Sequence, residues 1–308
     1  MDSILSHLQP LSLEERIRSA LIEDLHPRGD VTSQALVPEE KIARAEIRSK
    51  DVGILAGTQV LEPVFRVTSE LLGEGSSEKK PEVQIHLADG ARLKKGDVVA
   101  TTTASARTIL VGERIALNLI CRFSGIATQT SHFASKIAHT KARLLDTRKT
   151  APLWRDLDKH AVACGGGLNH RYNLADMILI KDNHLALWGS QDPAGAVNAA
   201  RKKFPGIPVE VEVVDLAGLE HVCGNSEPDF VLLDNFGVEK LREAVRWCDS
   251  FFSGEKKNSK RPLLEASGGI SLETLVAIAE TGVDRISVGA LTHSVKVFDM
   301  SLEIFLTP

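Results

Sequence analysis

The stretch of residues 144–184 places two short apolar runs directly before clusters of charged and polar side chains. The first run leads into DTRK at residues 146–149, and the second, at residues 177–180, leads into KDNH at residues 181–184. A triple glycine and the sequence NHR of residues 169–171 lie between them. Parallel α/β barrels build their active sites from apolar strands that deliver charge at their carboxyl ends. The stretch therefore predicts a pocket for a strongly anionic ligand.

Apolar runs and helical patterns alternate throughout the part of the chain after residue 125. The runs, rich in Val, Ile and Leu, lie at residues 142–146, 177–180, 209–213, 230–233, 263–266 and 285–288. The helical patterns lie at residues 127–140, 154–163, 193–204, 216–224, 238–251 and 271–281. This alternation predicts a parallel sheet with crossover helices. Because no run resembles an edge strand and no GxGxxG follows the first strand, we expect a closed or nearly closed barrel rather than an open dinucleotide-binding sheet.

The first hundred residues have an α+β pattern instead. A helix is predicted at residues 11–25, and strands at residues 42–48, 83–87 and 98–100. A long apolar helix is predicted at residues 105–121. Arg114 lies on the apolar stripe of that helix, so its guanidinium either extends to solvent or points at an anion.

Composition and charge restrict the class of protein. The 308 residues carry a formal charge of −4, which argues against electrostatic binding to nucleic acid or to an anionic membrane. No run of 18 apolar residues and no secretory signal pattern is present. The cysteines show no CxxC or zinc-type spacing, and they are interpreted as unpaired thiols: Cys121, Cys164, Cys223 and Cys248. We therefore expect a cytoplasmic protein.

The predicted strands end in charged or glycine-rich sequences, and in a parallel barrel all these ends open at one mouth. Arginine offers paired donors for a carboxylate or phosphate and lysine offers a point charge, so Arg148, Lys149 and Lys181 suit an anionic substrate. Residues 267–269 and 289–291 stand between a strand and a helix. There, backbone N–H groups are available and glycine lets a phosphate approach closely.

Carboxylates follow two of the same strands. Glu210 and Glu212 face one side of their strand because they are two residues apart. In a cation-rich pocket, carboxylates hold a divalent metal or a sugar hydroxyl, and Glu212 and Asp234 suit either role for a Mg²⁺-bound ribose phosphate. Taken alone, Glu210 is equally well explained by an ion pair at the rim, and His170 by packing or hydrogen bonding.

Nine motifs extend this pattern over nearly the whole chain. They are ALIEDLHPRGDVTS, ILAG, ERIALNLICRFSGIAT, LLDTRKTAP, GGGLNHRYNLADMILIKDNH, VEVEV, LLDNF, EASGGI and SVGALTHS. In this order they resemble the quinolinate phosphoribosyltransferase family, the decarboxylating enzymes that make nicotinate mononucleotide. The resemblance implies an N-terminal α+β sandwich at residues 1–117 and an incomplete six-stranded α/β barrel of the type II phosphoribosyltransferase kind at residues 118–292. A tail at residues 293–308 would return to the N-terminal domain.

The resemblance also implies an activity: the transfer of phosphoribosyl from 5-phosphoribosyl 1-diphosphate to quinolinate, with Mg²⁺ as cofactor and loss of CO₂ and diphosphate. The family is built as a homodimer in which Arg114 would reach the partner's pocket. The quinolinate site would contain Arg148, His170, Arg171 and Lys181. The phosphoribosyl diphosphate and its metal would contact Lys149, Glu212, Asp234, Ser267, Gly268, Gly269, Gly289, Ala290 and Leu291, with Glu212 and Asp234 as metal ligands, directly or through water. Thr147 would also bind substrate.

Three other functions stay open at this stage. One is a same-fold paralogue with a different acceptor, such as the one associated with molybdenum transport. The others are a Schiff-base aldolase that uses Lys181 or Lys149, and a non-catalytic sensor of phosphorylated metabolites. The chain also departs from the family at one point. Leu153-Trp154-Arg155 stands where the family usually has Gly-Leu-Arg, and this concerns the shape of a loop beside the site.

Overall fold

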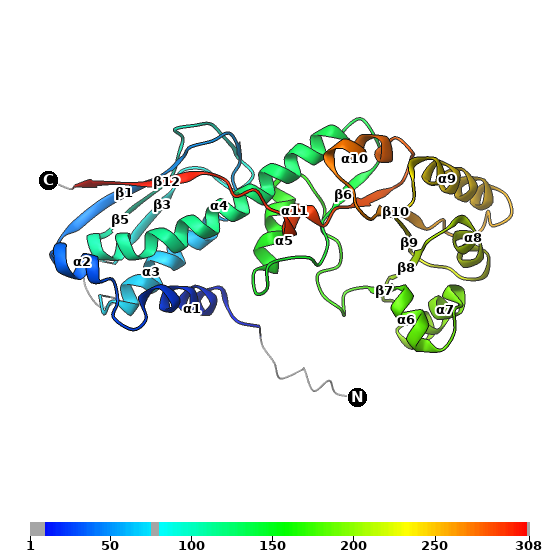
Figure 1. Cartoon of the computed structure of the whole chain (residues 1–308), viewed down its shortest axis with the longest axis horizontal. Coiled ribbons are helices and arrows are strands. Elements are labelled where there is room, and N and C mark those ends of the chain that lie inside the picture. Colours follow the sequence, from blue (N-terminus) through cyan, green and yellow to red (C-terminus); the bar gives the residue numbers. More distant parts are fainter. Residues whose placement is uncertain (1–9, 75–79, 307–308) are drawn as a thin grey trace. The chain divides into compact units, whose positions relative to one another are not determined.

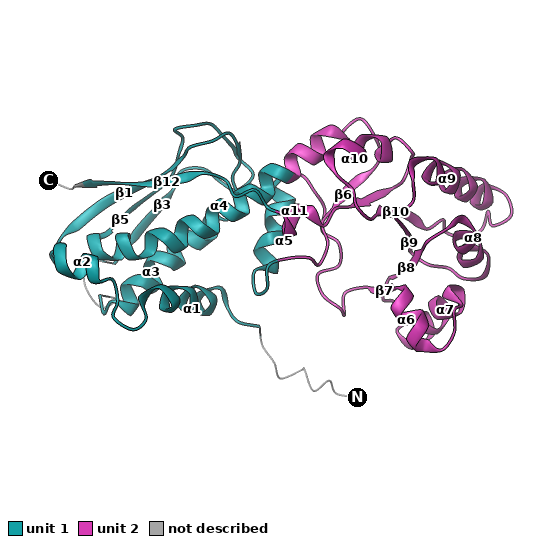
Figure 2. Ribbon diagram, viewed as in Figure 1, with its two compact units in different colours: residues 1–129, 151–165, 295–308 teal, residues 130–150, 166–294 magenta. Residues whose placement is uncertain are grey.

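The computed structural model describes residues 10–74 and 80–306, and the chain divides into two compact units (Figure 2). Unit 1 comprises residues 1–129, 151–165 and 295–308, and unit 2 comprises residues 130–150 and 166–294. The predicted domain limits, 1–117, 118–292 and 293–308, follow the chain continuously, whereas these units group residues by contact. Those limits stay predictions.

Unit 1 contains a four-stranded antiparallel sheet in the order β12-β1-β5-β3 (Figure 1). Its strands are β1 (Ile42–Ser49), β3 (Glu82–Ile85), β5 (Val98–Ser105) and β12 (Met300–Leu306). A small second sheet pairs β2 (Gly53–Ile54) with β4 (Arg92–Leu93). In β1, alternate side chains pack into the core, where Ala43 and Ala45 meet Ala104 and Ile109. Since β12 pairs with β1, the C-terminal residues return to the N-terminal sheet.

The helices of unit 1 are α1 (Leu13–Leu25), α2 (Val31–Leu36), η2 (Thr58–Val60), α3 (Leu61–Leu71), most of α4 (Ala106–Lys136), and α5 (Arg155–Cys164). The prediction of separate helices at residues 105–121 and 127–140 is wrong, because α4 is continuous through Gly125. Glycine is needed there for a different reason. A Cβ on Gly125 would lie 2.4 Å from the carbonyl oxygen of Lys296, so this residue allows a close backbone approach and does not end the helix.

Unit 2 is a parallel six-stranded sheet in the order β6-β11-β10-β9-β8-β7, as the alternating pattern predicted. Its strands are β6 (Arg143–Leu145), β7 (Ile178–Ile180), β8 (Val209–Val213), β9 (Phe230–Asp234), β10 (Leu263–Ser267) and β11 (Arg285–Ser287). Its helices are α6 (Asp182–Trp188), α7 (Pro193–Lys203), α8 (Leu216–Asn225), α9 (Val238–Ser253), α10 (Leu272–Ala279) and α11 (Ala290–His293). Because β6 and β7 are the two end strands and do not pair with each other, the barrel is incomplete.

Two further expectations concern membranes and cysteines. Among the described residues, no helix is both long and apolar enough to cross a membrane. The four cysteines all lie within the described residues and none forms a disulfide, as predicted.

The turn before α5 contains a leucine in the left-handed region of the backbone. Leu153 has a φ of 67° and a side chain that is 64% exposed. Its carbonyl oxygen accepts a hydrogen bond from the guanidinium of Arg16, which also binds both carboxylate oxygens of Asp156 at 2.8 Å. The same guanidinium lies 4.9 Å from the centre of the Trp154 ring. The contacts of Arg16 therefore hold a backbone conformation that leucine disfavours.

We expect Leu153→Gly to stabilise the protein by up to about 1 kcal/mol, because relief of the left-handed strain exceeds the added entropy of the unfolded chain. Little packing is lost, since the leucine side chain is mostly exposed. Urea unfolding of the two proteins measures the difference. Leu174, which is 72% exposed and is not at a positive φ, provides the control: Leu174→Gly should leave stability unchanged or lower it. A less stable Leu153→Gly variant would contradict the strain argument.

Candidate active site

The carboxyl ends of the unit 2 strands surround a cavity of about 740 Å³. Most of the residues predicted for the site line it: Thr147, Arg148, Lys149, His170, Arg171, Lys181, Asp234, Ser267, Gly268, Gly269, Gly289 and Ala290. Glu212 is not in the lining, but its carboxylate lies 2.5 Å from the ammonium group of Lys181. Leu291 is fully buried behind the lining. Segments that are up to about 150 residues apart in sequence thus meet in one cavity.

Arg114 does not belong to this group. It lies in unit 1, on α4, with its side chain exposed, and it lines a separate cavity together with Asn118, Arg122 and Asp299. The prediction that Arg114 completes the site of a partner subunit stays a prediction.

Arg148 and Arg171 bring two like charges into the cavity. Within the described residues, neither guanidinium forms an ion pair, and the buried Nε of Arg148 has no hydrogen-bond partner. Arg171 donates one hydrogen bond, from Nη1 to the carbonyl oxygen of Met177 at 3.1 Å. Burial and the charge of Arg148 lower the pKa of Arg171. Two cations that repel each other in a partly buried cavity make it a site for an anion.

His170, which lines the same cavity, contacts two fully buried carboxylates. Its Nε2 is 2.9 Å from Oε2 of Glu210 and 3.3 Å from Oε1 of Glu265. The other carboxylate oxygen of Glu265 is 2.8 Å from Nε of Arg285. Burial acts to raise the pKa of Glu265, but the hydrogen bond from His170 and the charges of His170 and Arg285 together lower it. The four side chains form a compact charge network on the inner face of the sheet.

The backbone also positions His170. Its N–H donates to the buried carboxylate of Asp146 at 2.8 Å, which fixes the chain after the triple glycine. The N–H of Arg171 points at Nδ1 of the imidazole at 2.8 Å, which opposes a proton there, and burial likewise disfavours the charged form. The hydrogen bonds and charges of Glu210 and Glu265 outweigh the effect of burial and raise the pKa of His170 to about 9.

This raised pKa predicts a pH-dependent stability. Because the folded-state pKa lies above the ordinary value of 6.5, protonation of His170 stabilises the fold below pH 6.5. This contribution to the free energy of unfolding, up to about 3 kcal/mol, should disappear as the pH rises through about 9. Urea unfolding across this range measures it. A His170→Gln variant should lose this part of the pH dependence, and an unchanged profile in that variant would show that another group titrates.

Glycines form another part of the cavity lining. Gly268 has a φ of 98°, and a Cβ there would lie 2.2 Å from the side-chain oxygen of Asn235, so no other residue fits without a shift. Asn235 itself has a φ of 55° and donates a hydrogen bond from Nδ2 to the carboxylate of Asp234 at 2.7 Å. At Gly289, a Cβ would lie 3.0 Å from Cδ of Lys149. Because glycine has no side chain, the backbone N–H groups at these positions stay accessible to a ligand that also contacts Asp234 or Lys149.

Glu212 and Asp234 are suited to a hard divalent cation. Both offer carboxylate oxygens near the cavity, and Mg²⁺ in phosphate-binding sites is held by one or two carboxylates together with substrate oxygens and water. The Glu212 side chain is 11% exposed and is oriented by Lys181. The donor set therefore fits Mg²⁺ accompanied by a phosphorylated substrate.

Sequence reasoning missed several residues of the cavity. The predicted set did not contain Glu265, Ser287, Asn235 and His293, all of which line it. A signal existed for Glu265, because it is an acid within an apolar strand, two residues before Ser267 and therefore on the same face. The interpretation of Glu210 as a rim ion pair is wrong, because its side chain is fully buried against His170.

Comparison with known proteins identifies the family of the chain. Residues 30–124 match the family described as quinolinate phosphoribosyl transferase, N-terminal domain, and residues 126–303 match its C-terminal domain. A nicotinate-nucleotide pyrophosphorylase [carboxylating] of Mycobacterium leprae is 41% identical over 94% of this chain and 96% of its own length. A probable enzyme of the same name from Bacillus subtilis is 36% identical over 98% and 96%.

Solved structures give the same result. A nicotinate-nucleotide pyrophosphorylase from Francisella tularensis superimposes with a TM-score of 0.82 at 35% identity, covering 95% of this chain and 96% of the other. The enzyme of that name from Ehrlichia chaffeensis has a TM-score of 0.83 at 33% identity, with 96% and 100% covered. The matches in sequence and in structure each cover most of the chain, and the chain therefore belongs to the quinolinate phosphoribosyltransferase family.

Proposed function

We propose that this protein transfers the phosphoribosyl group of 5-phosphoribosyl 1-diphosphate to quinolinate, with decarboxylation, to give nicotinate mononucleotide, CO₂ and diphosphate. The observation that carries the proposal is the cavity in which two arginines without ion pairs face a Lys181–Glu212 pair, Asp234 and two glycine-bearing loops. One substrate is a dicarboxylate and the other a polyphosphate, so both need such cations. The names of the relatives support the same reaction.

The residues act by binding and orientation. Arg148 and Arg171 hold the carboxylates of quinolinate and direct the pyridine nitrogen at C1 of the ribose. Lys149, with the backbone at residues 267–269 and 289–291, takes up the charge of the phosphates. The ribose carbon gains positive character as diphosphate leaves, and no covalent nucleophile on the protein is required.

Mg²⁺ is the proposed cofactor, held by Glu212 and Asp234 directly or through water. When bound with the substrate, it would neutralise charge on the departing diphosphate. Lys181 fixes the orientation of the Glu212 carboxylate through their contact of 2.5 Å.

Decarboxylation should be faster if the protein binds the two carboxylates of quinolinate with unequal strength. When one carboxylate leaves as CO₂, the electron pair of the broken C–C bond stays on the ring carbon, where the pyridinium formed by the transfer stabilises it, and that carbon then takes up a proton. A carboxylate fully paired with cations would leave more slowly, so we propose that the retained carboxylate has the stronger contacts with Arg148 and Arg171. A complex with bound quinolinate in which both carboxylates make equal contacts would refute this detail.

We further propose a homodimer in which Arg114 of the partner subunit completes the site. The supporting observation is that Arg114 is exposed on α4, although Leu117 and Cys121 on the same stripe of the helix are buried. The expected cytoplasmic location and the absence of nucleic acid or membrane partners stay predictions.

A direct test mixes the purified protein with quinolinate, 5-phosphoribosyl 1-diphosphate and Mg²⁺. Equal amounts of CO₂ and diphosphate should appear, and nicotinic acid should fail as a replacement for quinolinate. Turnover of nicotinic acid, or of another acceptor in preference to quinolinate, would favour a paralogue of the same fold.

The aldolase alternative has less support. A Schiff-base lysine needs an amine that is free to attack a carbonyl, but Nζ of Lys181 is held by the carboxylate of Glu212 at 2.5 Å. Trapping with borohydride and a carbonyl substrate tests this alternative, and we expect no adduct.

A further inference from the structure

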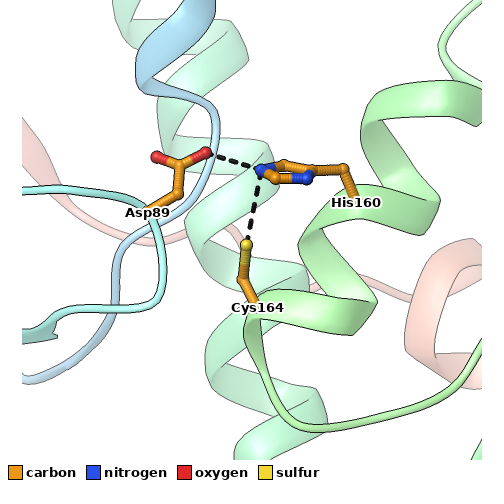
Figure 3. A group of neighbouring side chains, drawn as sticks. All are labelled: Asp89, His160 and Cys164. Carbon is orange, nitrogen blue, oxygen red and sulfur yellow. Dashed lines mark hydrogen bonds and ion pairs between the residues drawn. The ribbon is translucent and has the colours of Figure 1, made fainter.

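A second cluster of chemically reactive side chains lies in unit 1 and has no part in the proposed reaction. Figure 3 shows the ring of His160 with one nitrogen facing both the carboxylate of Asp89 and the sulfur of Cys164. Nε2 of His160 is 2.8 Å from Oδ2 of Asp89 and 3.4 Å from Sγ of Cys164. All three ligand atoms lie within 4.8 Å of one another. We infer that Asp89, His160 and Cys164 form a zinc site.

The separations agree with tetrahedral zinc. Zn–N bonds are about 2.0 Å long and Zn–S bonds about 2.3 Å, so the nitrogen and sulfur ligands of a tetrahedral zinc lie roughly 3.5 Å apart. The observed distance from Nε2 to Sγ is 3.4 Å. The oxygen and nitrogen ligands of a tetrahedral zinc are separated by roughly 3.3 Å. Oδ2 of Asp89 lies 2.8 Å from Nε2 of His160, so it would have to move away by only about 0.5 Å.

Local structure brings the ligands together. His160 and Cys164 are four residues apart on α5 and therefore project from the same face of the helix. Asp89 is held in place by its own hydrogen bonds: it accepts the N–H of Gly57 at 2.9 Å and that of Thr58 at 3.0 Å. The helix thus positions His160 and Cys164, and the two hydrogen bonds position Asp89, so all three ligands are preorganised.

The choice of ligands selects the ion. Sulfur, imidazole and carboxylate together suit Zn²⁺, whereas Mg²⁺ takes oxygen ligands only. A thiolate and a carboxylate balance the two charges of Zn²⁺. Burial and the charge of Asp89 raise the pKa of Cys164 to about 11, so the thiol is protonated until a metal displaces its proton.

The site is accessible from solvent, and its three protein ligands leave one coordination position open. The His160 side chain is 41% exposed and that of Asp89 14%, so an ion can enter from solvent. Three protein ligands leave the fourth position of a tetrahedral zinc for water. The other histidine–carboxylate cluster, around His170, differs because the cation of Arg285 already compensates Glu265.

The test uses the full-length protein, stripped of metal and then equilibrated with Zn²⁺ alone, without Mg²⁺ or substrates. After removal of free metal, we expect one bound zinc per chain by elemental analysis. Cys164→Ser and His160→Gln should each reduce this to background. His221→Ala is the matched control, because His221 lies 2.8 Å from Asp192 in the same kind of pair but without a thiol, and it should retain the zinc.

Cobalt provides a second readout that reports the sulfur ligand directly. The protein loaded with Co²⁺ should show a thiolate-to-cobalt charge-transfer absorption, and Cys164→Ser should lack it while keeping its circular dichroism spectrum. The proposal is overturned if the unmodified protein binds no zinc, if the charge-transfer band is absent, or if the two ligand variants bind as much zinc as the control. Equal binding by all variants would locate the ion elsewhere, for example at Glu212 and Asp234.

Discussion

Replacing Arg171 by alanine should lower kcat/KM for quinolinate by roughly 100- to 1000-fold, the effect of removing a charge-assisted contact to a buried substrate carboxylate. The same substitution should leave the free energy of unfolding unchanged or raise it. In the free protein, Arg171 is partly buried and repelled by Arg148. Among the described residues, its charge is compensated by one hydrogen bond to a carbonyl oxygen and by the nearby charge of Glu210. Steady-state kinetics and urea unfolding measure the two quantities.

The opposite signs of these effects separate binding from structure. An arginine that merely stabilised the fold would lower stability and activity together. Arg242→Ala is a suitable control, because Arg242 is an exposed arginine that pairs with Glu239 at 2.6 Å on the surface of α9 and should affect neither quantity. If Arg171→Ala destabilised the protein and kept its kcat/KM, the assignment of Arg171 to the substrate would be lost.

The second large effect is expected at Glu265. Glu265→Gln keeps the shape of the side chain but removes a charge that faces both His170 and Arg285 in a fully buried position. Breaking a buried ion pair on one side typically costs about 3–5 kcal/mol, because the remaining charge is left without compensation. We expect a destabilisation of about 3 kcal/mol in urea unfolding, together with a lower pKa of His170, which NMR titration of the imidazole would detect.

An exposed acid that also pairs with a histidine gives the comparison. Glu280 lies 3.2 Å from His139, and both side chains are about half exposed. Glu280→Gln should change the free energy of unfolding by no more than about 1 kcal/mol, because solvent screens the pair. Similar losses for Glu265→Gln and Glu280→Gln would mean that burial does not determine the strength of the network.

The sequence predicted unit 2 well because its periodicity is local. The alternation of valine and glutamate in β8, for example, identifies both the strand and the face on which Glu210 and Glu212 lie. The same local reasoning identified most of the cavity, since a charged residue directly after an apolar strand must lie at its carboxyl end. Parallel pairing then brings Arg148 and Asp234 to one edge of the sheet, although they are far apart in sequence.

Features that depend on contacts between distant segments could not be predicted in this way. Gly125 has the sequence pattern of a helix end, but only the approach of Lys296 explains it. The role of Glu265 in the charge network depends on its contact with His170, which the sequence of the strand does not indicate. Asp89 and His160 are 71 residues apart, and no spacing rule connects them. In each case the deciding partner is supplied by tertiary structure.

The pairing of β12 with β1 has a consequence for folding during synthesis. Residues 42–49 are made about 250 residues before their partners at residues 300–306. Until then, one edge of β1 presents unsatisfied N–H and carbonyl groups to any extended peptide nearby. The nascent chain therefore passes through a period in which the N-terminal sheet is open to pairing with another chain, and a chaperone that shields β1 should raise the yield of folded protein.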